Sequence, residues 1–282
     1  MKPPAFGYHR PRTVEEALDV LADLGAEGKV LAGGQSLVPL MSMRLAAPAH
    51  LVDVNHLPGL DTVEVDEKLV RVGALVRHSA LEHHDGAYGA LPLLRQALRL
   101  VAHPTIRNRG TTVGSLVHAD PAAELPAVLL LLGGTVTLRS TGGSRDVVAH
   151  DFFIGPMQSD VRPDELAVAA TFPVPPAGSG TSFVELSRRH GDYAMCGVAA
   201  VVTPADGRTT ARVALVGVGD GPVLVDLSEA VEGGRTDPGA VAGLVDAAID
   251  PADDIHATAD YRRHLAHVLV ERALHEAGDR AA

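Results

Sequence analysis

The chain has 282 residues, 46% of them hydrophobic and only 3% aromatic, with a formal net charge of −11. This length allows about two domains, and the composition indicates a mixed α/β core of Ala, Val and Leu rather than a disordered chain. The acidic charge gives no footprint for nucleic acid or an anionic membrane, and the single cysteine, Cys196, excludes an intrachain disulfide, a thiolate-only zinc site and a four-cysteine iron–sulfur cluster, so any redox chemistry needs an organic cofactor.

The N-terminal region shows no sign of export. Residues 1–12 carry prolines and early charges but no apolar segment of the kind found in secretory signals. The longest nearly unbroken apolar run, residues 125–132, is far shorter than the roughly 20 residues that span a bilayer. We therefore expect a cytoplasmic protein without membrane insertion, in which this run forms a buried helix.

The first predicted helix follows a capping box. The Thr13 hydroxyl and the Glu16 carboxylate satisfy free backbone donors at its start. Apolar residues then recur at helical spacing as far as Leu21, and Gly25 supplies a left-handed stop. The elements expected next are a strand over residues 30–32, a break at Gly33 and Gly34, a short helix over 37–45 and a strand over 51–54.

A long polar stretch, residues 103–121, interrupts the pattern in the part of the chain after residue 56. The elements expected around it are a strand over residues 69–73, helices over 91–100 and 122–132, and strands over 135–138 and 165–172. We expect the polar, glycine-punctuated residues 103–121 to form a loop. Connections of this length in compact domains are usually functional or disordered, and its place between well-patterned helices favours function.

The clearest break in composition is the segment PVPPAGSG, residues 173–180, where we place a domain boundary. We expect an N-terminal domain over residues 1–176, with subdomains of about 1–56 and 57–176, and a smaller C-terminal domain over 177–282. The C-terminal elements expected are strands over residues 182–186, 194–202 and 212–218 and helices over 240–249 and 259–273. This order predicts an α+β domain of antiparallel strands with helices on one face.

The segment LAGGQSLVPL is the first candidate binding site. Its paired glycines, Gly33 and Gly34, let the backbone approach a ligand and turn its N–H groups outward. Such a nest followed by a helix start holds a phosphate or pyrophosphate, and Gln35 and Ser36 can add hydrogen bonds to the phosphate oxygens. On spacing alone, an ordinary tight turn explains the segment equally well.

The segment TIRNRGTTVGSLVHADPAAE is the second candidate. Thr111, Thr112 and Ser115 offer donors to phosphate, and Asp120 and Glu124 offer acceptors to ribose or ribityl hydroxyls. The alternative is a solvated loop closed by a proline-started helix that Asp120 caps.

The two segments in their wider context resemble a known family. AGGQSLVPLMSMRLAAPAHLVDV and TIRNRGTTVGSLVHADPAAELPAVL are similar to the FAD-binding medium subunits of bacterial molybdenum hydroxylases, the group that contains carbon monoxide dehydrogenase, and to the central domain of xanthine dehydrogenase. The resemblance covers essentially the whole chain. It implies an α+β fold with a two-subdomain PCMH-type FAD-binding domain, followed by a smaller α+β C-terminal domain.

The resemblance also implies which residues contact FAD. Residues 32–36 would bind the pyrophosphate, residues 111–115 the diphosphate and ribityl part, and Glu124 a sugar. A backbone contact near Leu166 would touch the flavin, and the segment RRHGDYA of the second domain would cover it. The full set of expected cofactor-binding residues is Ala32, Gly33, Gly34, Gln35, Ser36, Leu37, Thr111, Thr112, Val113, Gly114, Ser115, Asp120, Glu124, Leu166, Arg189 and Tyr193.

Two positions depart from the family pattern. Val113 takes the place of the first glycine of the second loop, and Ser187 stands where some relatives carry a lysine. If the family's glycine has positive φ, a β-branched residue there is strained and the loop must differ. We therefore expect Val113 to affect the affinity for FAD and not the fold.

The implied function is electron transfer within a larger enzyme. The resemblance implies a molybdenum-cofactor large subunit that oxidises the substrate, a small subunit with two 2Fe–2S clusters, and FAD in this chain that reduces an external acceptor. It further implies a dimer of heterotrimers, and no catalytic residue or metal ligand in this chain. Two alternatives remain, a stand-alone flavin oxidoreductase and a scaffold that has lost FAD.

Several other motifs are expected to carry no chemistry. The segment GVGDG at Gly217 lacks the third glycine of a dinucleotide fingerprint and predicts a hairpin loop. The 14 histidines form no metal-binding pattern and are expected at the surface. Cys196 lies in an apolar strand, which predicts a buried, inert thiol, and no nucleophile motif accompanies His190 and Asp192.

Overall fold

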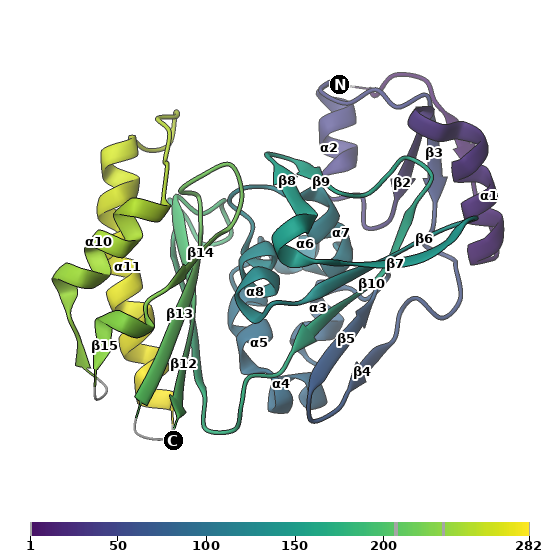
Figure 1. The fold of residues 1–282 in the computed structure, drawn as a ribbon. Coiled ribbons are helices and arrows are strands. Elements are labelled where there is room, and N and C mark those ends of the chain that lie inside the picture. Colours follow the sequence, from purple (N-terminus) through teal and green to yellow (C-terminus); the bar gives the residue numbers. More distant parts are fainter. Residues whose placement is uncertain (1, 206–207, 233–234, 282) are drawn as a thin grey trace.

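The computed structural model describes residues 2–205, 208–232 and 235–281. Figure 1 shows the chain passing from a small sheet at its N-terminal end, through a larger sheet, to a third sheet backed by two helices at its C-terminal end. The small sheet is parallel, with the order β1 (Gly7–His9), β3 (His50–Asp53), β2 (Gly28–Leu31). The larger sheet is antiparallel, with the order β4 (Val63–Val65), β5 (Leu69–Gly73), β10 (Leu166–Pro173), β6 (Thr135–Ser140), β7 (Gly143–Val148).

The first helix forms as its capping box predicts. In α1 (Val14–Leu24), the Thr13 hydroxyl accepts a hydrogen bond from the Glu16 amide at 3.1 Å, and the Glu16 carboxylate accepts from the Arg12 amide at 2.7 Å. Gly25 ends the helix with a φ of 51°. The short helix expected after the glycine pair is α2 (Leu37–Ser42), which ends three residues earlier than expected.

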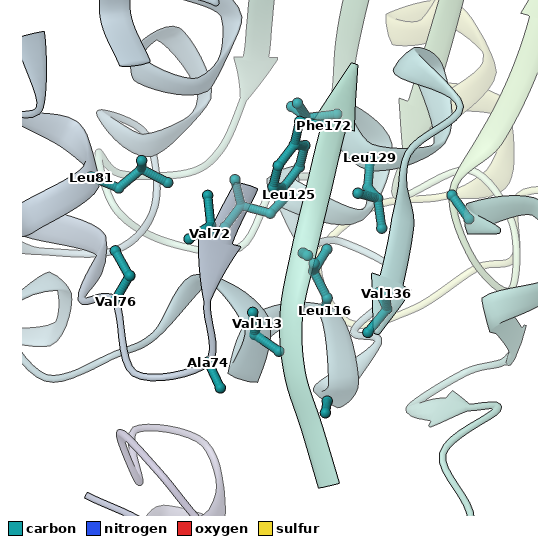
Figure 2. Close-up of a cluster of buried hydrophobic side chains, with 14 of the residues drawn as sticks. Val72, Ala74, Val76, Leu81, Val113, Leu116, Leu125, Leu129, Val136 and Phe172 are labelled. Atoms are coloured by element: carbon teal, nitrogen blue, oxygen red, sulfur yellow. The ribbon is translucent and has the colours of Figure 1, made fainter. Parts of the chain in front are cut away.

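Helix α8 (Glu124–Leu132) is buried on every side between two sheets. It contacts β10 on the five-stranded sheet, and it contacts β12 (Cys196–Ala205) and β13 (Arg208–Val216) on the C-terminal sheet. Figure 2 shows Leu125 and Leu129 of this helix beside Phe172 of β10. The buried helix expected from the apolar run is confirmed, because every residue of α8 is buried. Its apolar composition on all sides fits this enclosure.

The C-terminal sheet has the order β11 (Gly180–Leu186), β12, β13, β14 (Val223–Asp226) and is antiparallel throughout. Alternate residues of β12 serve two cores. Cys196 and Val198 pack with α11 (Ala259–Arg280), whereas Ala199 and Val201 join the core around α8. Helices α10 (Pro238–Ala248) and α11 cover the outer face, while α8 and α5 (Pro92–Leu98) cover the inner one (Figure 1). We expected helices on one face, but α5 and α8 of the N-terminal half cover the other. Within the described ranges, no helix is both long and apolar enough to cross a membrane.

The prediction that residues 103–121 form a loop is wrong. They contain α6 (Pro104–Arg107) and α7 (Thr112–His118). Pro104 starts the first helix, Thr111 caps the second through its hydroxyl, and Ala119 ends the second in a left-handed conformation. The sequence did not predict these helices because they have only four and seven residues. Each buries only part of its surface, so no apolar period is visible.

Other short elements were not predicted. They are α3 (His78–Glu82), α4 (Asp85–Ala90), α9 (Ala149–Phe152), β8 (Phe153–Gly155), β9 (Gln158–Ser159), β15 (Val231–Glu232), β16 (Arg235–Thr236), the strands β1, β4, β7 and β14, and two 3-10 turns, Gly25–Glu27 and Ser228–Ala230. Most are too short to show a period in sequence, so their formation depends on the neighbours with which they pair.

Candidate cofactor-binding site

The two candidate segments touch each other at Gly33. A Cβ atom added to Gly33 would lie 2.4 Å from the carbonyl oxygen of Arg109 and 2.8 Å from Cα of Gly110. Only a residue without a side chain allows this approach. Gly34 follows with a φ of +73°, which turns the backbone toward the start of α2. The glycine pair therefore brings residues 32–37 against the segment that carries residues 111–115.

The amide groups of residues 33–37 are available to a ligand. Within the described ranges, none of them donates a hydrogen bond to a protein acceptor, although all five residues are half-buried. The Gln35 side chain turns back and donates to the carbonyl of Gly33 at 3.0 Å. Successive amide groups that point outward in this way form an anion-binding nest, which favours the ligand-binding interpretation of the segment over the ordinary tight turn.

A surface pocket of about 350 Å³ opens beside this nest, at the carboxyl ends of β2 and β3. It is lined by Leu31, Ala32, Gly33, Gly34, Gln35, Val38, Pro39, Asp53, Asn55 and Arg109. Ligands of sheet proteins commonly bind at the carboxyl ends of parallel strands. Asp53, Asn55 and Arg109 were absent from the sequence-based set. Asp53 at the end of β3 and Asn55 shortly after it could have been found from this preference.

The second segment is largely turned into the protein. The Thr111 hydroxyl accepts from the Gly114 amide at 3.1 Å, and the Thr112 amide donates to the carbonyl of Val76 at 3.2 Å. Both threonines are buried, and the Thr112 hydroxyl has no hydrogen-bond partner among the residues that the structure describes. Ser115 is half-buried, so its hydroxyl is the more accessible of the three donors expected here.

Val113 is not strained. It lies in the first turn of α7, it is not among the described non-glycine residues with positive φ, and its side chain is 2% exposed. Figure 2 shows it packed in the core close to Ala74 and Leu116. The side chain is therefore enclosed by the core, which limits a cofactor contact at this position to the backbone.

Acidic side chains collect where α8 begins. Asp120 and Glu124 are each 8% exposed, and Asp120 accepts a hydrogen bond from the Ala122 amide at 2.9 Å. Asp120 does not cap α8, because the N-cap residue is Ala123. Burial raises the pKa of Glu124 to about 7, and the charge of Asp120 adds to the shift. Near neutral pH the Glu124 carboxyl group can therefore donate as well as accept.

Glu185 of β11 joins this acidic group from the C-terminal half. Its Oε2 atom is buried and has no hydrogen-bond partner in the described part of the chain. Burial raises the pKa of Glu185 to about 8, with a further contribution from the charge of Glu124. Sequence reasoning missed this residue, because an acidic side chain on an amphipathic strand is normally solvent-exposed.

The loop before β12 reaches over the same region. Gly191 has a φ of +84°, and a Cβ atom there would lie 2.8 Å from the carbonyl oxygen of Ala102 and 2.8 Å from the His103 ring. This contact anchors the loop on the segment that precedes α6. Tyr193 is 66% exposed, while desolvation of its hydroxyl, followed by the charges of Asp120 and Glu124, raises its pKa. Tyr193 is thus electrostatically coupled to the acidic group.

Leu166 and Arg189 are also among the expected cofactor-binding residues. Leu166 begins β10 and is 2% exposed, so its backbone rather than its side chain would meet a ligand. Arg189 is exposed, and its carbonyl oxygen accepts a hydrogen bond from the Ser187 hydroxyl at 2.8 Å. In the described part of the chain, no hydrogen bond joins either residue to the nest or to the acidic group.

Two of the remaining motifs have the local structure that the sequence predicts. The GVGDG segment joins the antiparallel strands β13 and β14 as a hairpin loop. Cys196 is fully buried, and burial raises the pKa of its thiol to about 12. His78 is an exception to the surface prediction. It is 4% exposed beneath Gly110, and burial lowers its pKa to about 4.

Comparisons with known proteins place this site in a family. A family model described as "FAD binding domain in molybdopterin dehydrogenase" matches residues 4–175, and one described as "CO dehydrogenase flavoprotein C-terminal domain" matches residues 181–277. The chain is 41% identical to the 6-hydroxypseudooxynicotine dehydrogenase complex subunit alpha of Paenarthrobacter nicotinovorans, covering 100% of this chain and 97% of that protein. It is 38% identical to the nicotine 6-hydroxylase medium subunit of the same organism, covering 99% and 100%.

A solved structure agrees with these matches. Carbon monoxide dehydrogenase from Hydrogenophaga pseudoflava superposes with a TM-score of 0.94 at 35% identity, covering 100% of both chains. Fold and family models together define an FAD-binding flavoprotein module with its C-terminal domain. The chain belongs to the FAD-binding medium subunits of the molybdenum hydroxylase family. The expected resemblance, fold class, cofactor and oxidoreductase character are confirmed.

The residues present fit FAD. The free amides of residues 33–37 can meet a diphosphate, and the buried hydroxyl of Thr112 lacks a partner on the neighbouring segment. Glu124 and Asp120 supply groups for sugar or ribityl hydroxyls. When bound, FAD supplies the ability to exchange electrons singly and in pairs. The described residues contain no group of three or more His, Cys, Asp or Glu that can hold a metal ion.

Proposed function

We propose that this chain is the electron-carrying flavoprotein subunit of a molybdenum hydroxylase, receiving electrons from partner iron–sulfur clusters and passing them to an external acceptor. Its residues bind and orient FAD, and they do not attack the organic substrate. The contact of Gly33 with the Arg109 carbonyl supports this proposal, because it brings two segments that are far apart in sequence side by side, where one cofactor can contact both. The cytoplasm is the compartment in which we propose that it acts.

Within this proposal, each segment has its own role toward FAD. Residues 32–37 hold the pyrophosphate through the free amides of the nest. Residues 111–115 fix the neighbouring part of the cofactor, with Ser115 as the accessible hydroxyl. Asp120 and Glu124 hold sugar or ribityl hydroxyls, the backbone at Leu166 meets the flavin, and Tyr193 and Arg189 cover it from the C-terminal half, as the sequence resemblance implies.

We propose two partners for the chain, a large subunit with the molybdenum cofactor and a small subunit with two 2Fe–2S clusters. Relatives named as medium subunits or medium chains support this, since those names imply larger and smaller companions. We further propose a dimer of heterotrimers. We also propose that the chain divides into two structural units near residues 176 and 177, close to the gap between the two family-model matches.

Two measurements test this proposal. Titration of the purified chain with FAD should quench the fluorescence of the cofactor and give bound flavin absorption bands. Purification of the natural complex should recover a molybdenum subunit and an iron–sulfur subunit, and its substrate should bleach the flavin bands only when both are present. Substrate turnover by the chain with FAD alone would instead indicate a stand-alone flavin oxidoreductase. A folded chain that takes up no FAD would indicate a scaffold.

A further inference from the structure

A pair of side chains outside the expected site links its two segments. Asn55 follows β3, and its Nδ2 donates to the carbonyl of Ala32 at 2.8 Å and to Oδ1 of Asp53 at 2.6 Å. Its Oδ1 accepts from Nη2 of Arg77 at 2.7 Å. The orientation of the Asn55 amide is fixed by these bonds, because reversing it would place donors against the Arg77 guanidinium.

Arg77 completes the connection. Its Nη1 donates to the carbonyl oxygen of Arg109 at 2.6 Å. This is the same oxygen that lies 2.4 Å from where a Cβ atom of Gly33 would be. The bonds Ala32–Asn55, Asn55–Arg77 and Arg77–Arg109 therefore join the backbone of the first segment to that of the second. We call these three bonds the Asn55–Arg77 link.

The link holds two backbone carbonyls that adjoin the amides available to a ligand. With the Ala32 and Arg109 carbonyls engaged from the side of Asn55 and Arg77, the amides of residues 33–37 have no protein acceptor in the described ranges. A guanidinium group suits this task, because its planar fork reaches two acceptors at once, whereas an ammonium group is a point donor. Asp53 is itself held by the Tyr8 hydroxyl, which anchors the far end.

We infer that Asn55 and Arg77 are positioning residues that set the spacing of the two FAD-binding segments before the cofactor arrives. This inference rests on the proposed roles of residues 32–37 and 111–115. Neither residue needs to touch FAD. Each acts through backbone that does, as residues behind a ligand shell commonly do.

The test compares FAD binding by the full chain and its variants. Arg77→Met, Asn55→Ala and the double variant remove the link, Arg77→Lys keeps one bond, and Arg71→Met is the matched control. Arg71 is also a half-buried arginine, but it lies in the middle of β5 and bonds the hydroxyls of Thr137 and Thr171 on the five-stranded sheet. The dissociation constant comes from quenching of FAD fluorescence, and the thermal midpoint without FAD reports folding.

We expect Arg77→Met and Asn55→Ala each to weaken FAD binding by about 10- to 100-fold, the range found for supporting residues behind a ligand. The double variant should lose little more than either single variant, because both break one link. Arg77→Lys should lie between. In a further variant, Arg77→Ala, which leaves the arginine site open, millimolar guanidinium should restore binding while methylammonium should not. At saturating FAD, the visible circular dichroism of the flavin should change in the link variants but not in Arg71→Met.

Several outcomes would overturn the inference. Unchanged affinity in Arg77→Met and Asn55→Ala, fully additive losses, or an equal loss in Arg71→Met would each contradict a shared link. If Arg77→Met fails to fold, Arg77→Lys and Asn55→Asp decide the question by the same affinity and circular dichroism measurements. Absence of FAD binding by the unaltered chain would instead contradict the proposed site, which separates the two failures.

Discussion

Glu185 of β11 lies close enough to Glu124 of α8 that the charge of one raises the pKa of the other. The two carboxyl groups come from the two halves of the chain, and no described residue forms a hydrogen bond with Oε2 of Glu185. The titratable groups that also bear on this pair are Asp120, before α8, and Tyr193, on the loop before β12. The arginines on the two helices that pack against β11 bond other groups. Arg95 of α5 donates to the Glu82 carbonyl and the Asp85 carboxylate, and Arg280 of α11 donates to the Thr181 carbonyl and the Glu276 carboxylate.

This pair predicts a contribution to stability that is lost as the pH rises in the chain without FAD. Both folded-state pKa values, about 7 and about 8, lie above the usual glutamate value of 4.5. At these two carboxyl groups the folded protein therefore binds more protons than the unfolded one between these limits, and their contribution to the free energy of unfolding falls with increasing pH from about 4.5 to about 8.

Glu185→Gln isolates this effect. The variant should match the unaltered chain near pH 5 and exceed its free energy of unfolding at pH 9 by roughly 1–3 kcal/mol, since it removes a buried charge without a partner. Urea unfolding at a series of pH values measures the difference, with the exposed residue Glu67 changed to Gln as the control. A constant difference across the pH range would show that Glu185 does not titrate in this window.

Gly33→Ala should weaken FAD binding without unfolding the chain. The added methyl group would meet the Arg109 carbonyl at 2.4 Å and force the two segments apart. An overpacking cost of about 1–3 kcal/mol corresponds to a loss of affinity of about 5- to 150-fold. Gly89→Ala is the control, because a Cβ atom there meets nothing within 4 Å. Equal FAD affinities in the two variants would contradict the predicted crowding.

Val113→Gly should destabilise the protein rather than improve the cofactor site. Val113 is 2% exposed in the core and lies in a helix. Loss of its side chain and the cost of a helical glycine together should lower the free energy of unfolding by roughly 2–4 kcal/mol. Chemical denaturation measures this, and Val113→Ala separates the cavity from the backbone effect. A glycine variant of full stability and tighter FAD binding would show that the valine obstructs the site.

Cys196 should not react in the folded protein. It is fully buried, and its thiol pKa is raised to about 12, so almost no thiolate forms at pH 8. A colorimetric disulfide reagent should therefore release no signal from the native chain and one equivalent after denaturation in urea. Rapid labelling of the native chain would mean that β12 opens far more readily than its packing indicates.

The sequence predicted the elements with a strong period or a clear terminal signal. The capping box at Thr13, the strand at residues 69–73 and the apolar run of α8 all formed where expected. The helices α6 and α7 were missed because they are short and polar, so that their caps rather than their periodicity define them. In the site, the glycine pair was evident from sequence.

Long-range relationships in the site were beyond the reach of sequence patterns. The partners of Asn55, Arg77 and Glu185 are distant along the chain. The spacing of nearby residues does not predict such pairs. Val113 illustrates the reverse case. A departure from a family motif suggested backbone strain, yet the structure has ordinary helical backbone at that residue and uses the side chain as core.

The burial of α8 on both sides has a consequence for how the chain can be cut. The helix belongs to the segment that matches the first family model, yet it forms the inner wall of the sheet that matches the second. If the two fragments were separated near residue 176, each would expose a large hydrophobic surface that the other fragment covers in the intact chain. The two regions can thus be told apart in the sequence, but each depends on the other for a complete core. We expect cleavage of the linker to leave the protein folded, whereas removal of either fragment should destabilise the other.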